Sequence, residues 1–126
     1  MLENILAISV GAIVGALARY ALTHISSELT HHTGFPFGTL AVNVLGCFAV
    51  GWILTWTADH SHDRWRLLAA TGFCGAFTTF SAFAYESMAY WRAGAFGTFA
   101  INVVANNVFS FLALIGGIAA RNGQTR

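Results

Sequence analysis

The chain has 126 residues, of which 56% are hydrophobic and only 9% are charged. A water-soluble domain of this size carries roughly 25% charged residues, so the composition excludes such a domain and indicates a membrane protein. All six basic residues are arginines and the formal net charge is only +1, so nothing in the charge balance favours a nucleic-acid partner.

Four apolar stretches are long enough to cross a bilayer, which takes about 20 helical residues each. They cover residues 4–23, 38–57, 65–91 and 94–120. Because these stretches leave only short loops, we expect a single all-α domain over residues 1–126 with four transmembrane helices. The start of the chain lacks the positive region and cleavage site of a signal peptide, so we expect the first stretch to be retained as a span.

The first span carries a pair of glycines four residues apart and one permanent charge. Gly11 and Gly15 form a GxxxG pattern, which favours close contact with another helix. Arg19 lies near the end of the same apolar stretch. Two interpretations of Arg19 remain open: it caps carbonyls or reaches the interface, or it is a cation at a pore mouth that draws anions inward.

The second span contains an amide in an apolar setting. Thr39 and Asn43 are four residues apart and therefore share one helix face. An amide in mid-membrane is unfavourable unless it is hydrogen-bonded. Asn43 therefore either bonds to a neighbouring helix or is a donor that lines a polar path.

The third span is interrupted by an unusual mixture of glycines, aromatic residues and hydroxyls at residues 72–83. Gly75 has no β-carbon, so we expect the backbone to leave helical geometry there. The hydroxyls of Thr78, Thr79 and Ser81 can satisfy backbone groups that a break releases. The sequence therefore predicts a broken third helix, whose freed carbonyls are potential cation ligands.

Two phenylalanines and a carboxylate follow the expected break. Phe80 and Phe83 are three residues apart and share one face, which is also the pattern of an ordinary packing stripe. Glu86 follows in the outer turns of the span, where it either pairs with an arginine or lies in a water-filled vestibule.

The fourth span carries a ladder of polar side chains. Asn102, Asn106 and Ser110 are spaced by four residues, with Asn107 beside them. At a rise of 1.5 Å per residue the ladder is about 12 Å long. Such groups connect helices or line a path, and a ladder of several favours a path.

The chemistry of these spans favours an anion. Amide and hydroxyl donors and the positive edges of aromatic rings attract negative charge, while the acidic rings typical of cation pores are absent. Glu86 is the only acidic residue within the spans, and it is off-centre. No nucleophile–base pair or set of metal ligands is visible, so we do not expect an enzyme.

Several runs together resemble the Fluc/CrcB family of fluoride channels. They are GALARY at residues 15–20, GTLAVNVLG at 38–46 and GAFTTFSAF at 75–83, with the asparagines of the fourth span. The resemblance covers essentially the whole chain. It implies a passive channel that exports cytoplasmic fluoride across the bacterial inner membrane. It also implies an antiparallel, dual-topology homodimer with two pores and a structural sodium ion at the centre of its interface.

The resemblance also implies roles for individual residues. The rings of Phe80 and Phe83 would contact fluoride with their edges, and Asn43 would be the amide donor at the pore. The other expected pore residues are Ser81, Asn102, Asn106 and Ser110. The backbone carbonyls of Gly75 and Thr78 would be the sodium ligands, and Arg19 and Glu86 would be vestibule or structural charges. Family members often have tyrosine where Asn102 stands and serine at Asn106.

The orientation of the chain is weakly specified by its charges. Arginines 64, 66, 121 and 126 lie on the side of the termini, against Arg92 and Arg19 on the other. The positive-inside rule favours cytoplasmic termini, whereas the family inserts both ways, and we expect the dual topology.

Two alternatives come from other classes of membrane protein. A small four-helix proton-coupled multidrug exporter needs a membrane-embedded carboxylate early in the chain, where this sequence has Arg19 instead. A non-transporting scaffold subunit would use the asparagines and phenylalanines for packing alone.

Overall fold

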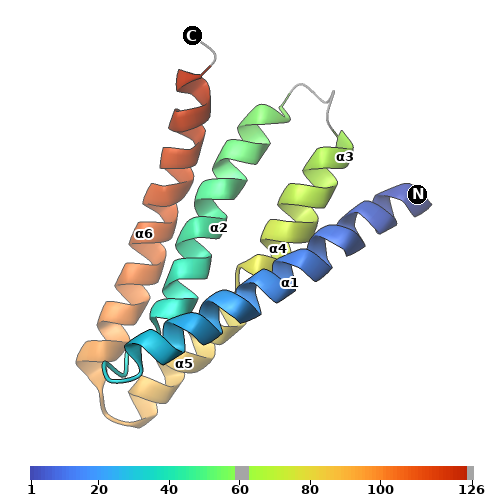
Figure 1. Cartoon of the computed structure of the whole chain (residues 1–126). Helices are drawn as coiled ribbons and strands as arrows, with labels where there is room; N and C mark the ends of the chain where they lie inside the picture. Colours follow the sequence, from blue (N-terminus) through green and yellow to red (C-terminus); the bar gives the residue numbers. More distant parts are fainter. Residues whose placement is uncertain (59–62, 125–126) are drawn as a thin grey trace.

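The computed structural model describes residues 1–58 and 63–124, and every element in them is helical (Figure 1). The elements are α1 (Leu2–Thr30), α2 (Phe37–Trp56), α3 (Asp63–Trp65), η1 (Arg66–Cys74, a π-helical segment), α4 (Gly75–Phe77), α5 (Phe80–Arg92) and α6 (Phe96–Gly123). The segments α3 to α5 follow one another along a single interrupted span. Within the described residues, four helical units are therefore long and apolar enough to cross a membrane, which confirms the predicted four-span, all-α fold.

The first helix continues beyond the predicted span. It ends at Thr30, so the expected loop is wrong for residues 24–30. The hydroxyls of Thr23, Ser27 and Thr30 each donate to a carbonyl of the preceding turn at 2.7–2.8 Å. These local bonds satisfy the hydroxyls of a polar stretch that stays helical to Thr30. A turn at residues 31–33 follows and leads to Gly34, whose φ of 66° lies in the left-handed region that glycine adopts readily.

Helix α1 crosses the first half of the third span at very short range (Figure 1). A β-carbon added at Gly11 would overlap the carbonyl oxygen of Leu68, and one added at Gly15 would overlap that of Phe73. Gly72 makes the reciprocal approach from η1, toward the Ile8 carbonyl. Backbone therefore packs on backbone, which confirms the predicted glycine contact of the first span.

Helix α2 packs along α6, and the two halves of this contact differ (Figure 1). In one half, Gly51 approaches the Leu114 carbonyl and Gly117 approaches the Phe48 carbonyl too closely for any side chain. In the other half, Asn43 of α2 is hydrogen-bonded to Asn106 of α6. The polar half borders the interruption of the third span.

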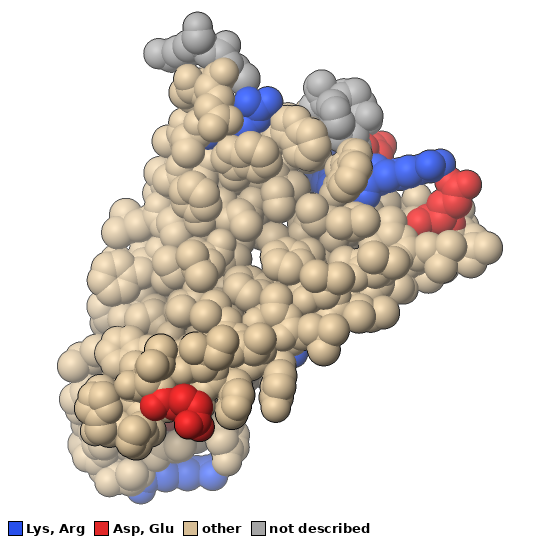
Figure 2. All heavy atoms as spheres, in the orientation of Figure 1, with Lys and Arg blue, Asp and Glu red and all other residues tan. Residues whose placement is uncertain are grey.

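The outside of the bundle is apolar and its charges lie toward the ends. Figure 2 shows a broad and almost uncharged band between two groups of charged side chains, with one small basic patch inside it. Within the described residues the fully buried set is small and includes polar Asn102 and Thr57 beside Val42 and Cys74. This distribution suits a protein whose solvent is lipid. Arg126, used above for orientation, lies outside the described residues.

The third span is broken, as predicted, but Gly75 is not where its backbone departs from the helix. Gly75 has φ −61° and ψ −35°, and a β-carbon added there would have no neighbour closer than 4.0 Å. The extended residues are Thr78, with ψ 158°, and Thr79, with φ −150° and ψ 107°. The prediction that placed the departure at Gly75 is therefore wrong. The reason is that a residue of α2 binds the backbone of Thr79 in place of its partners within the helix.

Candidate functional site

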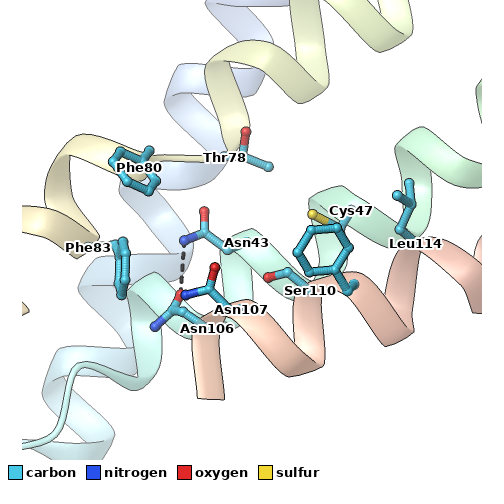
Figure 3. Close-up of a pocket in the computed structure, with 10 residues that line it drawn as sticks. Asn43, Cys47, Thr78, Phe80, Phe83, Asn106, Asn107, Ser110 and Leu114 are labelled. Carbon is cyan, nitrogen blue, oxygen red and sulfur yellow. Dashed lines mark hydrogen bonds between the residues drawn. The ribbon is translucent and has the colours of Figure 1, made fainter. Parts of the chain in front are cut away.

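A groove of about 260 Å³ lies between α2, the interruption of the third span and α6 (Figure 3). Five of the residues expected in a pore line it: Asn43, Phe80, Phe83, Asn106 and Ser110. Its other lining residues are Cys47, Thr78, Asn107, Phe111 and Leu114. We call this cavity the Asn43 groove.

Asn43 holds the backbone of the interruption in place. Its Oδ1 accepts a hydrogen bond from the Thr79 N–H at 2.8 Å, and its Nδ2 donates to the Thr79 carbonyl at 3.3 Å. One amide thereby satisfies both backbone groups of an extended residue that has no helical partners. The Thr79 side chain also accepts from the Ala82 N–H at 3.2 Å and caps the start of α5.

A missing side chain on α2 makes room for the interruption. A β-carbon added at Gly46 would overlap Cγ2 of Thr78. Gly46 thus lets Thr78 approach α2, one turn from the point where Asn43 binds Thr79. The segment GTLAVNVLG therefore supplies both the space and the hydrogen bonds that the break requires.

The two phenylalanines lie at one end of the groove, beside the amides. Their ring centroids are 5.4 Å apart and the planes are inclined by 61°, an edge-to-face arrangement. Phe83 is 8% exposed, whereas Phe80 is 76% exposed. Figure 3 shows both rings next to Asn43, while Cys47 and Leu114 lie toward the other end. Positive ring edges and amide N–H groups are thus close together.

The polar ladder of α6 divides between the groove and the helix contacts. Asn106 accepts from Asn43 Nδ2 at 3.0 Å and donates to Asn102 Oδ1 at 2.9 Å. Asn102 is completely buried and donates to Ser87 Oγ of α5 at 3.0 Å. The structure therefore places Asn106 and Ser110 in the lining of the groove, and Asn102 behind it, between α6 and α5.

A second cavity, of about 600 Å³, is lined by Arg19, Ser81, Glu86 and Thr39, among others. Arg19 Nη1 donates to the Thr78 carbonyl at 3.4 Å, so the guanidinium lies against a carbonyl of the break. Thr39 Oγ1 donates to Glu86 Oε1 at 2.6 Å. Ser81 lines this cavity and not the Asn43 groove, and its hydroxyl is 3.3 Å from Thr79 Oγ1.

The expected sodium ligands are two carbonyls that have lost their helical donors. In a continuous helix the Gly75 carbonyl would accept from the Thr79 N–H and the Thr78 carbonyl from the Ala82 N–H. Those donors bond instead to Asn43 and to Thr79 Oγ1. Carbonyls of interrupted helices are the oxygen ligands that transporters offer to sodium. The residues therefore fit such an ion, although one chain supplies only part of a shell and Arg19 lies against the Thr78 carbonyl.

Residues 6–118 match the family model described as "CrcB-like protein, Camphor Resistance (CrcB)". The chain belongs to the CrcB family. A relative from Koribacter versatilis, named "Fluoride-specific ion channel FluC", is 49% identical over 111 residues, which are 86% of this chain and 87% of the relative. Relatives of the same name from Paracoccus denitrificans and Dehalococcoides mccartyi are 36% and 35% identical, over at least 97% of each chain.

Family membership confirms the resemblance seen in the sequence. Together with four apolar helices, it makes this CrcB protein a multi-pass membrane protein, in agreement with the predicted bacterial inner membrane.

Some residues around the groove were not singled out from the sequence. Cys47, Phe111 and Leu114 line the groove, and no local signal distinguishes them from ordinary apolar positions. Ser87 is buried and bonds to the asparagine ladder. Its spacing of four from Phe83 hints at a shared face, but only the packing of α5 on α6 brings it to Asn102.

Proposed function

We propose that this CrcB protein is a passive, fluoride-selective ion channel that exports cytoplasmic fluoride through the Asn43 groove. The observation that supports this most is the meeting of amide donors and phenylalanine ring edges in one groove of an apolar bundle. Donors without a nearby acidic lining suit a small anion that accepts hydrogen bonds. The printed name of the relatives, a fluoride-specific ion channel, agrees with this chemistry.

Fluoride is small and strongly hydrated, so a pore must replace the water it loses. The Asn43 N–H that donates to the Thr79 carbonyl at 3.3 Å makes the longest bond of that amide, and it is the one we propose turns to the ion. Asn106, Ser110 and the edges of Phe80 and Phe83 complete the path. Close packing of the rings excludes larger halides.

We further propose that two copies form an antiparallel homodimer with two pores. In one copy Phe80 is 76% exposed, and Asn107 is exposed on α6 beside the exposed apolar side chains of Val104 and Val108. Lipid cannot hydrogen-bond to such an amide, whereas a second copy can cover it. Accessibility labelling of the termini in cells tests the orientation: both sides should be labelled, and labelling from one side alone contradicts dual topology.

The proposed sodium ion belongs to the dimer centre. The carbonyls of Gly75 and Thr78 would hold it, with the same two groups of the second copy across the axis. When bound, the ion supplies positive charge near the pores and joins the two copies. Arg19, Ser81 and Glu86 would line the vestibule on the other side of the interruption.

The decisive experiment is ion efflux from liposomes that hold the purified protein at low density, with fluoride and chloride tested in parallel. We expect rapid fluoride loss, little chloride movement and no effect of a pH gradient. Transport that depends on the proton gradient would favour the small multidrug exporter. Efflux of neither fluoride nor chloride would favour the non-transporting scaffold subunit.

A further inference from the structure

We infer that Ser87 and Asn102 are positioning residues for the proposed anion path: they fix the sense of a hydrogen-bonded series of amides that ends at Asn43. This inference rests on the proposed fluoride channel. Neither residue lines the groove, so neither acts by touching the ion.

The series joins three helices through side chains. From the break inward, Thr79 N–H donates to Asn43 Oδ1 at 2.8 Å, and Asn43 Nδ2 donates to Asn106 Oδ1 at 3.0 Å. Asn106 Nδ2 then donates to Asn102 Oδ1 at 2.9 Å, and Asn102 Nδ2 to Ser87 Oγ at 3.0 Å. Every amide donates in the same direction, from α2 through α6 to α5.

Backbone groups at both ends dictate that direction. The Thr79 N–H can only donate, so Asn43 must turn its oxygen toward it. At the other end the Phe83 carbonyl can only accept, and it takes the single hydroxyl hydrogen of Ser87 at 2.7 Å. Ser87 is then left as an acceptor for Asn102. The two ends agree, so the whole series has one satisfied arrangement.

Because these side chains are buried, any other arrangement of their hydrogen bonds is unfavourable. Asn102 is 0% exposed, Asn106 4% and Ser87 5%. Water cannot replace a lost partner at such positions, so a reversed amide leaves a donor facing a donor. Asn106 accordingly presents its oxygen to Asn43, and the Asn43 N–H groups stay beside Phe83 at the groove (Figure 3).

Replacing Ser87 by alanine removes the acceptor that ends the series. The Asn102 N–H is then unpaired, and turning that amide over only moves the mismatch to Asn106, which would also have to give up its bond to the Asn102 backbone carbonyl at 3.2 Å, and then to Asn43. There the mismatch meets the fixed Thr79 N–H. Every arrangement of the series then leaves one polar group unpaired, so the bond from Asn43 to Asn106 at the groove no longer belongs to a fully satisfied series.

The test measures fluoride and chloride efflux from liposomes with Ser87→Ala, Asn102→Leu and the double variant. We expect Ser87→Ala to lower fluoride efflux about tenfold, the scale of one hydrogen bond in the barrier, and to lower the fluoride-over-chloride ratio. Because both residues act through one series, the double variant should fall no further than Asn102→Leu alone. Size-exclusion chromatography and thermal unfolding establish that each variant is folded.

Thr55→Val is the matched control. Thr55 Oγ1 donates to the Gly51 carbonyl at 2.7 Å, the same local bond that Ser87 makes, but no side chain among the described residues donates to it and it does not line the groove. It should conduct like the parent. Parental flux and selectivity in Ser87→Ala, or losses that multiply in the double variant, would overturn the positioning role while leaving the channel intact. A parent protein that moves no fluoride would instead overturn the proposed function.

Discussion

The two halves of the third span are held in the bundle by different physics. Its first half, η1, packs against α1 through the backbone at Gly11, Gly15 and Gly72. Its second half, from Thr79 into α5, is held by side-chain amides of α2 and α6. The first contact depends on shape, and the second depends on donors and acceptors.

The glycine contact holds the helices together and nothing more, whereas the amide contact also provides groups that can act on an ion. Helices in lipid gain nothing from burying apolar surface against each other, so close packing and hydrogen bonds must join them. A glycine contact leaves no polar group to act on an ion. The amide contact leaves N–H groups at the edge of the Asn43 groove, so the side chains that hold the helices can also serve the proposed path.

The largest effect is expected where the amide contact meets the aromatic rings. Phe80→Ile and Phe83→Ile should each reduce fluoride efflux to the level of empty liposomes, because an aliphatic side chain has no positive edge. Both variants should remain folded and keep the oligomeric state of the parent. Phe109→Ile, on a part of α6 that does not line the groove, is the control and should conduct normally. Normal fluoride efflux from both folded ring variants would refute the ring-edge role.

A substitution in the glycine contact should lower the stability of the protein but leave its ion selectivity unchanged. Gly15→Ala places a methyl group against the Phe73 carbonyl, so we expect it to lower the free energy of unfolding by about 1–3 kcal/mol. Thermal unfolding in detergent measures this loss. Gly97→Ala is the control, because a β-carbon there meets nothing within 4 Å. An altered fluoride-over-chloride ratio in folded Gly15→Ala would contradict the separation of the two contacts.

The smallest effect is expected at an amide that lines the groove but lies outside the series. Asn107 Nδ2 donates to the Val103 carbonyl of its own helix at 2.7 Å, and within the described part of the chain no other side-chain amide is hydrogen-bonded to it. Asn107→Leu should therefore lower fluoride efflux only about twofold, less than the loss of one full hydrogen bond. A loss as large as that of Ser87→Ala would place Asn107 within the conducting machinery. The comparison uses the same liposome assay.

The sequence predicted that the third span is broken but not at which residues its backbone opens. Local propensity pointed to Gly75, which can leave helical geometry, yet Gly75 is helical. The backbone opens at Thr78 and Thr79 because Asn43, far away in the sequence, satisfies the N–H and carbonyl of Thr79. A partner on another helix outweighed the conformational freedom of a glycine.

The asparagine ladder shows the same division. Its spacing placed Asn102, Asn106 and Ser110 on one stripe of a helix, and this could be read from the sequence because helical periodicity is local. Which side chain of the ladder lines the groove and which one lies behind it depends on the neighbours of α6. Asn102 lies behind the groove because it is hydrogen-bonded to Ser87 of α5. Asn106 lies at the edge of the groove because it is hydrogen-bonded to Asn43 of α2.

The sequence by itself determined the membrane setting, the four spans, the interruption of the third and the family, since these follow from composition, length, periodicity and contiguous motifs. Only the tertiary structure decided where the backbone opens, which amides face the groove and how Arg19 meets the Thr78 carbonyl. Those features are hydrogen bonds between helices. In a bilayer a released backbone group must find its partner within the protein, and the partner's identity depends on the packing of distant residues.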